Sequence, residues 1–221
     1  MENTDFNTNQ QAETRNRIID AFIEHVLETG KQPVSVYKFA QSLGIPEEEF
    51  YNYFTSFQGV KGAVWDRIFD ETYATMRAQE VYQSYSAREK LLAFYYTWVE
   101  VLKKNRSYLL ALYESHADFK KVTPQEVRSF RDKFKTFAKG IIQEGKAEGE
   151  IVDRKYLSDK YDEALWLETL FIFQFWLRDN SVSFEKTDVA IEKSVRLAFD
   201  LIGRTAVDSF VDLAKFLYQS K

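Results

Sequence analysis

The stretch SLGIPEEEFYNYF, residues 42–54, reads as the end of one short helix, a turn, and the start of another. Gly44 suits the turn, because glycine readily adopts the left-handed conformation that follows many helix ends. Pro46 suits the first turn of a helix, where its missing N–H leaves no hydrogen bond unmade. We therefore predict two short helices joined by a glycine turn, which is the arrangement of a helix-turn-helix.

A longer helix is predicted before this pair. Apolar residues recur there at three- and four-residue intervals, which is the spacing of one buried helix face. Gly30 and Pro33 are expected to end that helix, and Ser35 to cap the next one through its side-chain oxygen. The predicted three-helix unit occupies residues 13–60, and the polar residues 1–12 are expected to form a disordered tail.

The remaining chain, residues 61–221, is also predicted to be helical. Only 8 glycines and 3 prolines occur in 221 residues, and no useful length of sequence alternates apolar and polar residues as a strand would. The fold class is therefore all-α, with an antiparallel helical domain after the helix-turn-helix. Helices are expected over residues 57–79, 86–104, 123–148, 158–178 and 184–219, and capping boxes start the second and third of these.

Composition excludes several kinds of protein. There is no cysteine, so neither a disulfide framework nor a thiolate metal site is possible. The longest apolar stretch, residues 164–177, is too short to span a bilayer and contains Glu168 and Gln174. The start of the chain lacks a signal-peptide pattern, so a cytoplasmic location is expected. His25 and His116 have no nearby partners in the sequence, so no metal, cofactor or enzymatic activity is expected.

The helix-turn-helix motif carries a family resemblance. The residues concerned are Ser35, Phe39-Ala40, Gly44-Ile45, Phe50-Tyr51, Phe54 and Ser56. At these offsets the chain resembles the TetR family of bacterial transcription regulators, specifically over roughly residues 14–65. Beyond that range the helix lengths and the loop EGKAEGEIV, residues 144–152, are similar. The resemblance implies a DNA-binding unit followed by a larger domain that binds a ligand and forms a dimer.

The resemblance also implies partners and site residues. The chain is expected to be a repressor that binds double-stranded operator DNA under the control of a small apolar or lipid-like ligand. A homodimer is expected through helices 158–178 and 184–219, which carry more apolar surface than one domain can bury. The expected DNA-binding residues are Ser35, Tyr37, Lys38, Glu47, Tyr51, Asn52, Tyr53 and Lys61.

Two departures from the family pattern concern charge. Phe57 stands where the family usually has a lysine, and the recognition helix starts with three glutamates. Residues 12–65 contain five Lys or Arg and seven Asp or Glu, which gives −2 where a polyanion would bind. Two interpretations of the glutamates are open: they stabilise the helix start, or one of them accepts a hydrogen bond from cytosine. The alternative function is a TetR-fold lipid-binding protein without DNA-binding activity.

Aromatic residues are concentrated at residues 94–98 and 166–176. They are expected either to form the core and the dimer interface or to line an apolar ligand cavity, and both roles can hold within one run. Tyr95, Trp98 and Trp166 are the expected ligand-binding residues, because their polar tips can orient a bound molecule.

Overall fold

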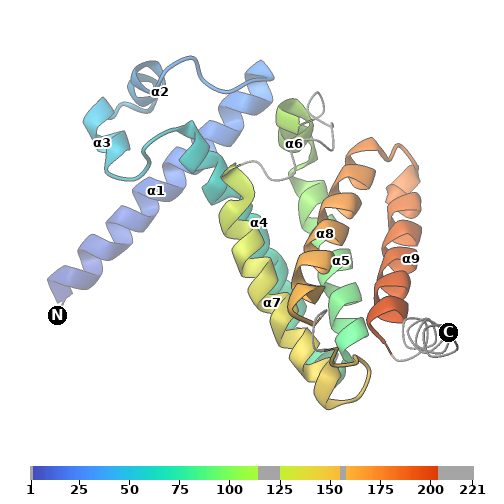
Figure 1. Ribbon diagram of the computed structural model, residues 1–221. Helices are drawn as coiled ribbons and strands as arrows, with labels where there is room; N and C mark the ends of the chain where they lie inside the picture. Colours follow the sequence, from blue (N-terminus) through green and yellow to red (C-terminus); the bar gives the residue numbers. More distant parts are fainter. Residues whose placement is uncertain (1, 114–124, 155–157, 204–221) are drawn as a thin grey trace, which may run out of the picture. The chain divides into compact units, whose positions relative to one another are not determined.

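The computed structural model describes residues 2–113, 125–154 and 158–203 of the chain. In these ranges the protein consists of nine α-helices and short 3-10 turns without any strand, as the sequence predicted (Figure 1). Contacts divide it into two compact units, and each unit draws on two separate parts of the chain.

The first unit extends to Asp70 and also contains residues 102–130. The sequence predicted a boundary at residues 60 and 61, which lie inside one continuous helix. The helices of this unit are α1 (Glu2–Thr29), α2 (Val36–Leu43), α3 (Glu47–Tyr51), the first part of α4 (Phe57–Arg77), and α6 (Arg106–Tyr113).

Phe57 lies at the centre of the aromatic core of the first unit. Its ring stacks on Phe22 of α1 with centroids 5.5 Å apart. Phe39 of α2 and Phe50 of α3 meet the same ring edge-on, at 5.5 and 5.8 Å. Phe57, in the position of the family's lysine, therefore joins all three N-terminal helices to α4 by apolar packing.

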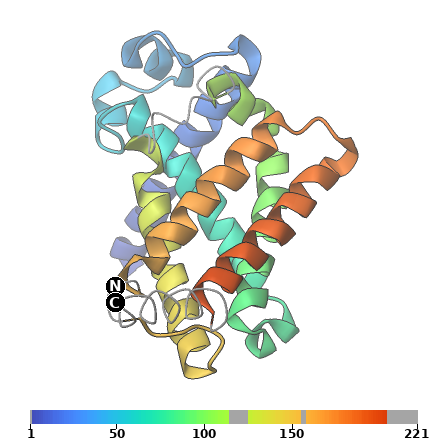
Figure 2. The same ribbon diagram turned by 45° about the vertical axis from the view of Figure 1, so that its right-hand side comes forward.

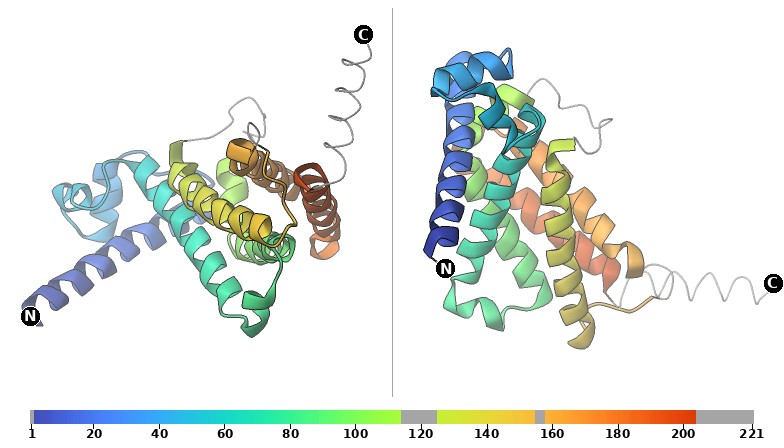
Figure 3. Two further views of the ribbon diagram at one scale, coloured as in Figure 1. Left: turned by 60° about the horizontal axis from the view of Figure 1, so that its bottom comes forward. Right: turned by 90° about the vertical axis from the view of Figure 1, so that its left-hand side faces the viewer.

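The start of α1 differs from the sequence prediction. Residues 2–12 are helical and continue α1, whereas a disordered tail was predicted. No glycine or proline occurs before Gly30, so nothing in the backbone interrupts the helix once it has formed. Figure 3 shows the N-terminal part of α1 continuing past α2 and α3.

The second unit contains residues 71–101 and the chain from Arg131 onwards. The predicted capping box at the start of α5 is confirmed: Ser86 N donates to Glu89 Oε2 at 2.8 Å, and Glu89 N donates to Ser86 Oγ at 3.3 Å. This unit holds the end of α4 and most of α5 (Ala87–Lys104) and α7 (Arg128–Ala147). It also holds α8 (Tyr161–Arg178), α9 (Glu185–Ile202) and the 3-10 turns η1 (Glu80–Ser84), η4 (Ser158–Lys160) and η5 (Val182–Phe184).

The predicted helix 123–148 is shorter than expected at its start. Residues 123 and 124 lie outside the described part of the chain. A 3-10 turn, η3 (Gln125–Val127), leads from there into α7.

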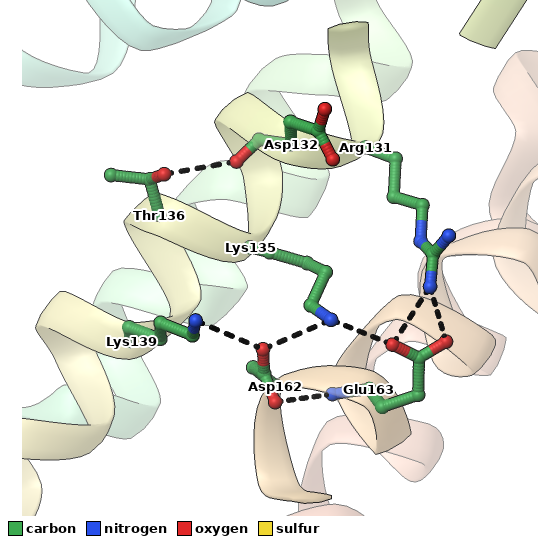
Figure 4. A network of polar contacts seen from close by, with 7 residues as sticks. All are labelled: Arg131, Asp132, Lys135, Thr136, Lys139, Asp162 and Glu163. Carbon is green, nitrogen blue, oxygen red and sulfur yellow. Dashed lines mark hydrogen bonds and ion pairs between the residues drawn. The ribbon is translucent and has the colours of Figure 1, made fainter. Parts of the chain in front are cut away.

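An ionic network joins α7 to the first turn of α8 (Figure 4). Arg131 Nη2 contacts both carboxylate oxygens of Glu163, at 2.7 and 2.9 Å. Lys135 Nζ contacts Glu163 at 2.7 Å and Asp162 at 3.2 Å, and Lys139 approaches Asp162 at 3.7 Å. Hydrogen bonds from Lys135 and Arg131 lower the pKa of Glu163. The acids also lie at the positive end of the α8 dipole, so the network favours this helix start.

The single helix predicted over 184–219 is wrong, because α9 ends at Ile202. Gly203 leaves the helical conformation, with φ −77° and ψ −175°. The backbone N–H of Val152 donates to the carbonyl oxygen of Ile202 at 3.0 Å. This last carbonyl of α9 therefore finds its hydrogen-bond partner outside the helix. Residues 204–219 lie outside the described part of the chain.

Candidate DNA-binding surface and dimer face

The helix-turn-helix is built by the local signals that predicted it. Ser35 is the N-cap of α2, and its Oγ accepts a hydrogen bond from Lys38 N at 3.3 Å. Gly44 has φ 68°, in the left-handed region that favours glycine. The N–H of Gly44 donates to the Gln41 carbonyl and that of Ile45 to the Ala40 carbonyl, each at 3.1 Å. These two bonds satisfy carbonyls at the end of α2 and fix the turn.

Contacts with α1 hold the α2–α3 pair in place. Arg17 of α1 donates through Nη2 to the carbonyl oxygen of Leu43, the last residue of α2. Phe39 and Phe50 are buried and meet edge-on with ring centroids 6.2 Å apart. The pair is therefore fixed both by packing and by a charge-assisted hydrogen bond to a helix end.

The predicted DNA-binding residues differ in exposure. Tyr37, Lys38, Tyr51 and Asn52 are exposed, and Ser35, Glu47, Tyr53 and Lys61 are half-buried. The helix α3 ends at Tyr51, so Asn52 is its C-cap and Tyr53 lies just beyond it. Their roles towards DNA remain predictions.

The structure brings Glu47 and Tyr51 together on one side of α3. The Tyr51 hydroxyl donates to Glu47 Oε1 at 3.2 Å. Partial burial and the neighbouring carboxylate both raise the pKa of Tyr51. Glu47 therefore has a local role in holding the exposed Tyr51 ring, in addition to starting the helix.

A hollow of about 600 Å³ lies between α1 and the segment after α3, lined by Gln11, Ala12, Arg15, Asn52 and Tyr53. Arg15 lies over the ring of Phe54, with its guanidinium carbon 5.2 Å from the ring centroid. A cation thus lies beside two predicted DNA-binding residues. Nothing in the sequence singled out Arg15, because its proximity to them depends on how α1 packs.

The predicted ligand-binding residues are packed in the core of the second unit. Tyr95, Trp98 and Trp166 are each at most 2% exposed. The Tyr95 hydroxyl lies 3.1 Å from Thr169 Oγ1 and donates to the Leu165 carbonyl at 3.2 Å. The three residues are not among those lining the large cavity described next, so their role in ligand binding remains a prediction.

The helices α8 and α9 form an antiparallel hairpin (Figure 2). A groove of about 1020 Å³ lies between their side chains. Its lining is mainly apolar, and several large side chains on this face are exposed to solvent. They are Leu167, Phe171, Val189, Leu197 and Leu201, which are 39–59% exposed. An apolar surface of this kind is typical of an interface.

The described ranges contain neither a metal site nor a membrane-spanning helix. No group of three His, Asp or Glu residues there is arranged to hold a metal ion. His25 is half-buried on α1, and His116 lies outside those ranges. No helix in the described part of the chain is both long enough and apolar enough to cross a membrane.

Comparison with known proteins identifies the class of this helix-turn-helix protein. Residues 90–217 match the tetracycline repressor-like C-terminal domain, which is more than half of the chain. The chain therefore belongs to the tetracycline repressor family of transcription regulators, as the sequence motif indicated.

Solved structures have the same fold at low sequence identity. A TetR transcriptional regulator from Nitrosomonas europaea is 17% identical to this chain, with a TM-score of 0.57. The alignment covers 84% of this chain and 97% of the regulator. A transcriptional regulator from Cytophaga hutchinsonii is 20% identical to this chain, with a TM-score of 0.51. The alignment covers 86% of this chain and 98% of that regulator. None of the curated proteins compared with the chain matches it.

Proposed function

We propose that this protein is a homodimeric repressor that binds operator DNA through α2 and α3 and releases it when a small apolar ligand binds. The observation that carries the proposal is the helix-turn-helix itself, with its left-handed Gly44 turn and the hydrogen bond from Arg17 to the end of α2. Membership of the family supports the same function. In this arrangement the exposed residues Tyr37, Lys38 and Tyr51 lie on the two helices that would approach the duplex.

The charge of the first unit affects how it would bind DNA. The three glutamates and the small number of cations limit phosphate neutralisation, which supplies much of the affinity of such proteins. Arg15 adds a cation beside Asn52 and Tyr53. We assign Arg15, Lys38 and Lys61 to the phosphate backbone, and the side chains of Tyr51 and Asn52 to the bases.

The proposed dimer forms when α8 and α9 of one copy pack on α8 and α9 of another. Leu167 and Phe171 of α8, and Leu197 and Leu201 of α9, supply the exposed apolar surface. A twofold interface uses the same surface of both copies, so a single self-complementary groove suffices. The charge change Leu197→Glu in the groove should give monomers by light scattering, whereas Glu192→Gln, outside the groove lining, should leave the dimer intact.

Binding-site selection tests the DNA-binding function. Purified protein would be incubated with random duplex DNA at low salt, and the bound sequences enriched and read. We expect a palindromic sequence, because a twofold dimer presents two equivalent α3 helices. A variant with Tyr37→Ala and Asn52→Ala should lose this enrichment while keeping its helical circular dichroism. If no sequence is enriched and no duplex is bound, DNA binding is excluded.

A lipid-binding protein without DNA-binding activity is the second candidate. Two observations favour it: the −2 charge of residues 12–65 and the open apolar groove between α8 and α9. Native mass spectrometry of the purified protein separates the two functions. A co-purified lipid on a protein that binds no duplex supports this candidate, whereas a lipid-free dimer that selects one DNA sequence supports the regulator.

A further inference from the structure

Glu168 interrupts the apolar wall that α8 contributes to the groove. It is the only charged residue among the α8 residues described in that lining. Both carboxyl oxygens of Glu168 are inaccessible to solvent. Neither oxygen accepts a hydrogen bond of normal geometry from a residue in the described part of the chain. A buried carboxylate without such bonds is costly, so burial shifts the ionisation equilibrium of Glu168 towards its neutral form.

The groups around Glu168 do not supply a positive charge. Tyr95 of α5 and Ser194 of α9 present their hydroxyls to it. These hydroxyls donate to backbone carbonyls instead, Tyr95 to Leu165 and Ser194 to Ile191, each at 3.2 Å. The charged residues in the rest of the described lining are Glu185, Lys186 and Lys193, all of which are exposed on α9.

Burial raises the pKa of the Glu168 carboxyl to about 7, although the nearby hydroxyls of Ser194 and Tyr95 lower it in part. The side chain is therefore divided between its charged and neutral forms near neutral pH. An exposed glutamate would be almost fully ionised there.

We propose that dimerisation through the groove is coupled to protonation of Glu168. When a second copy of this chain covers the groove, Glu168 of each copy takes up a proton, so that acid favours the dimer. This inference rests on the dimer interface proposed above and adds regulation by pH to it. The carboxyl oxygens are already buried, but the groove beside them is open to solvent. Covering the groove replaces this nearby water with apolar side chains and penalises the charged form of Glu168 further. The dimer then binds more protons than two separate chains.

The sign of the pH effect follows from this difference. Dimer formation raises the Glu168 pKa above its value in the free chain. The contribution of Glu168 protonation to the free energy of association is therefore fully present below the free-chain pKa. It is lost as the pH rises through the pKa in the dimer. Within that window each proton changes the dissociation constant by up to about tenfold per pH unit, and two carboxyls contribute per dimer.

Sedimentation velocity over a range of concentrations measures this effect in the full chain. Between about pH 6 and pH 8.5 we expect the dissociation constant of the natural protein to rise by at least about tenfold. Glu168→Gln, which is nearly isosteric and cannot ionise, should show less than about a threefold change over the same range. The matched control Glu192→Gln, on α9 but outside the groove lining, should behave like the natural protein. Equal pH dependence of Glu168→Gln and the natural protein would overturn the proposal.

The interface and its proton are tested separately. If Leu197→Glu leaves the dimer intact, the proposed interface is wrong. If Leu197→Glu gives monomers but the natural dimer is insensitive to pH, the interface stands and the proton uptake is wrong. Should the dimer be too tight to dissociate on dilution, the urea transition of each variant, measured at two protein concentrations and both pH values, reports the same linkage.

Discussion

Arg154 Nη2 donates to the carbonyl oxygen of Gly203 at 2.7 Å and thereby holds the end of α9. Its Nη1 donates to the carbonyls of Leu201 at 3.2 Å and Ile202 at 3.3 Å. The last carbonyls of a helix have no partner within the helix. One guanidinium therefore caps three successive carbonyls, and its five N–H donors make it suited to do so.

We predict that Arg154→Ala lowers the free energy of unfolding by about 2 kcal/mol, because it removes several charge-assisted hydrogen bonds. Urea denaturation at fixed protein concentration measures this loss. Arg154→Lys is the control: it keeps the charge but lacks the planar fork, so it should recover only part of the stability. An alanine variant as stable as the natural protein would show that water replaces the cap without loss.

The end of α9 also shows which features the sequence could not predict. Apolar residues continue at helical spacing beyond Gly203, so periodicity favoured one long helix to residue 219. The groups that cap the helix at Ile202 come from Val152 and Arg154, which are distant in sequence. By contrast, Ser35 and Gly44 act on residues within a few positions, and both were predicted correctly.

Sequence composition was also unable to separate a packed core from a cavity. The aromatic run that contains Tyr95 and Trp98 predicted both, and the structure packs these two side chains in the core. The groove that the structure does contain depends on how α8 and α9 face each other. The position of Arg15 beside Asn52 likewise depends on helix packing, so no local pattern indicated it.

Asp179 holds the turn between α8 and α9. Its Oδ1 accepts from Ser181 N at 2.8 Å and Oγ at 2.6 Å, and its Oδ2 accepts from Thr187 N at 2.9 Å and Oγ1 at 2.7 Å. Burial raises the Asp179 pKa, but these hydrogen bonds lower it more, to about 2. The stabilisation is therefore fully present above the unfolded-state pKa of about 4 and is lost as the pH falls towards about 2.

For this turn we predict that Asp179→Asn costs about 1–3 kcal/mol of stability near neutral pH, since the amide is uncharged and one of its two ends cannot accept. Denaturant unfolding at several pH values should show the difference from the natural protein narrowing in acid. A difference that stays constant down to about pH 2.5 would mean that the carboxylate charge contributes nothing.

The same turn contains a strained backbone position. Ser183 has φ 54°, which is in the left-handed region of backbone conformation. Residues other than glycine adopt this conformation at a cost in free energy. Ser183→Gly should therefore raise the stability by about 0.5–1 kcal/mol, after subtracting the extra freedom of glycine in the unfolded chain. Thermal unfolding of the variant measures the gain.

Phe184 is the matched control for this change, because its φ is also positive, at 63°. Its ring, however, packs on Trp176 with centroids 5.9 Å apart. Phe184→Gly should destabilise the protein, because lost packing outweighs the relieved strain. Destabilisation by both substitutions would show that Ser183 contributes more through its side chain than its conformation costs.

The acidic start of α3 gives the prediction that bears most directly on function. We expect the combined change of Glu47, Glu48 and Glu49 to Gln to strengthen non-specific binding to duplex DNA by about tenfold or more at low salt, because repulsion from phosphates is removed. Fluorescence anisotropy with a random duplex measures it. Tyr51→Phe, which removes the hydroxyl bonded to Glu47 without changing charge, should leave non-specific binding unaltered.

Binding of the same variants to the selected operator then separates the two roles of the glutamates. If they act only by stabilising α3 and holding Tyr51, the triple variant should bind the operator at least as tightly as the natural protein. If one of them accepts a hydrogen bond from cytosine, operator binding should weaken by about 1–3 kcal/mol while non-specific binding still rises. Because Glu47 already accepts from Tyr51, we expect the first result. A weakening confined to the operator would instead assign base recognition to this acidic helix.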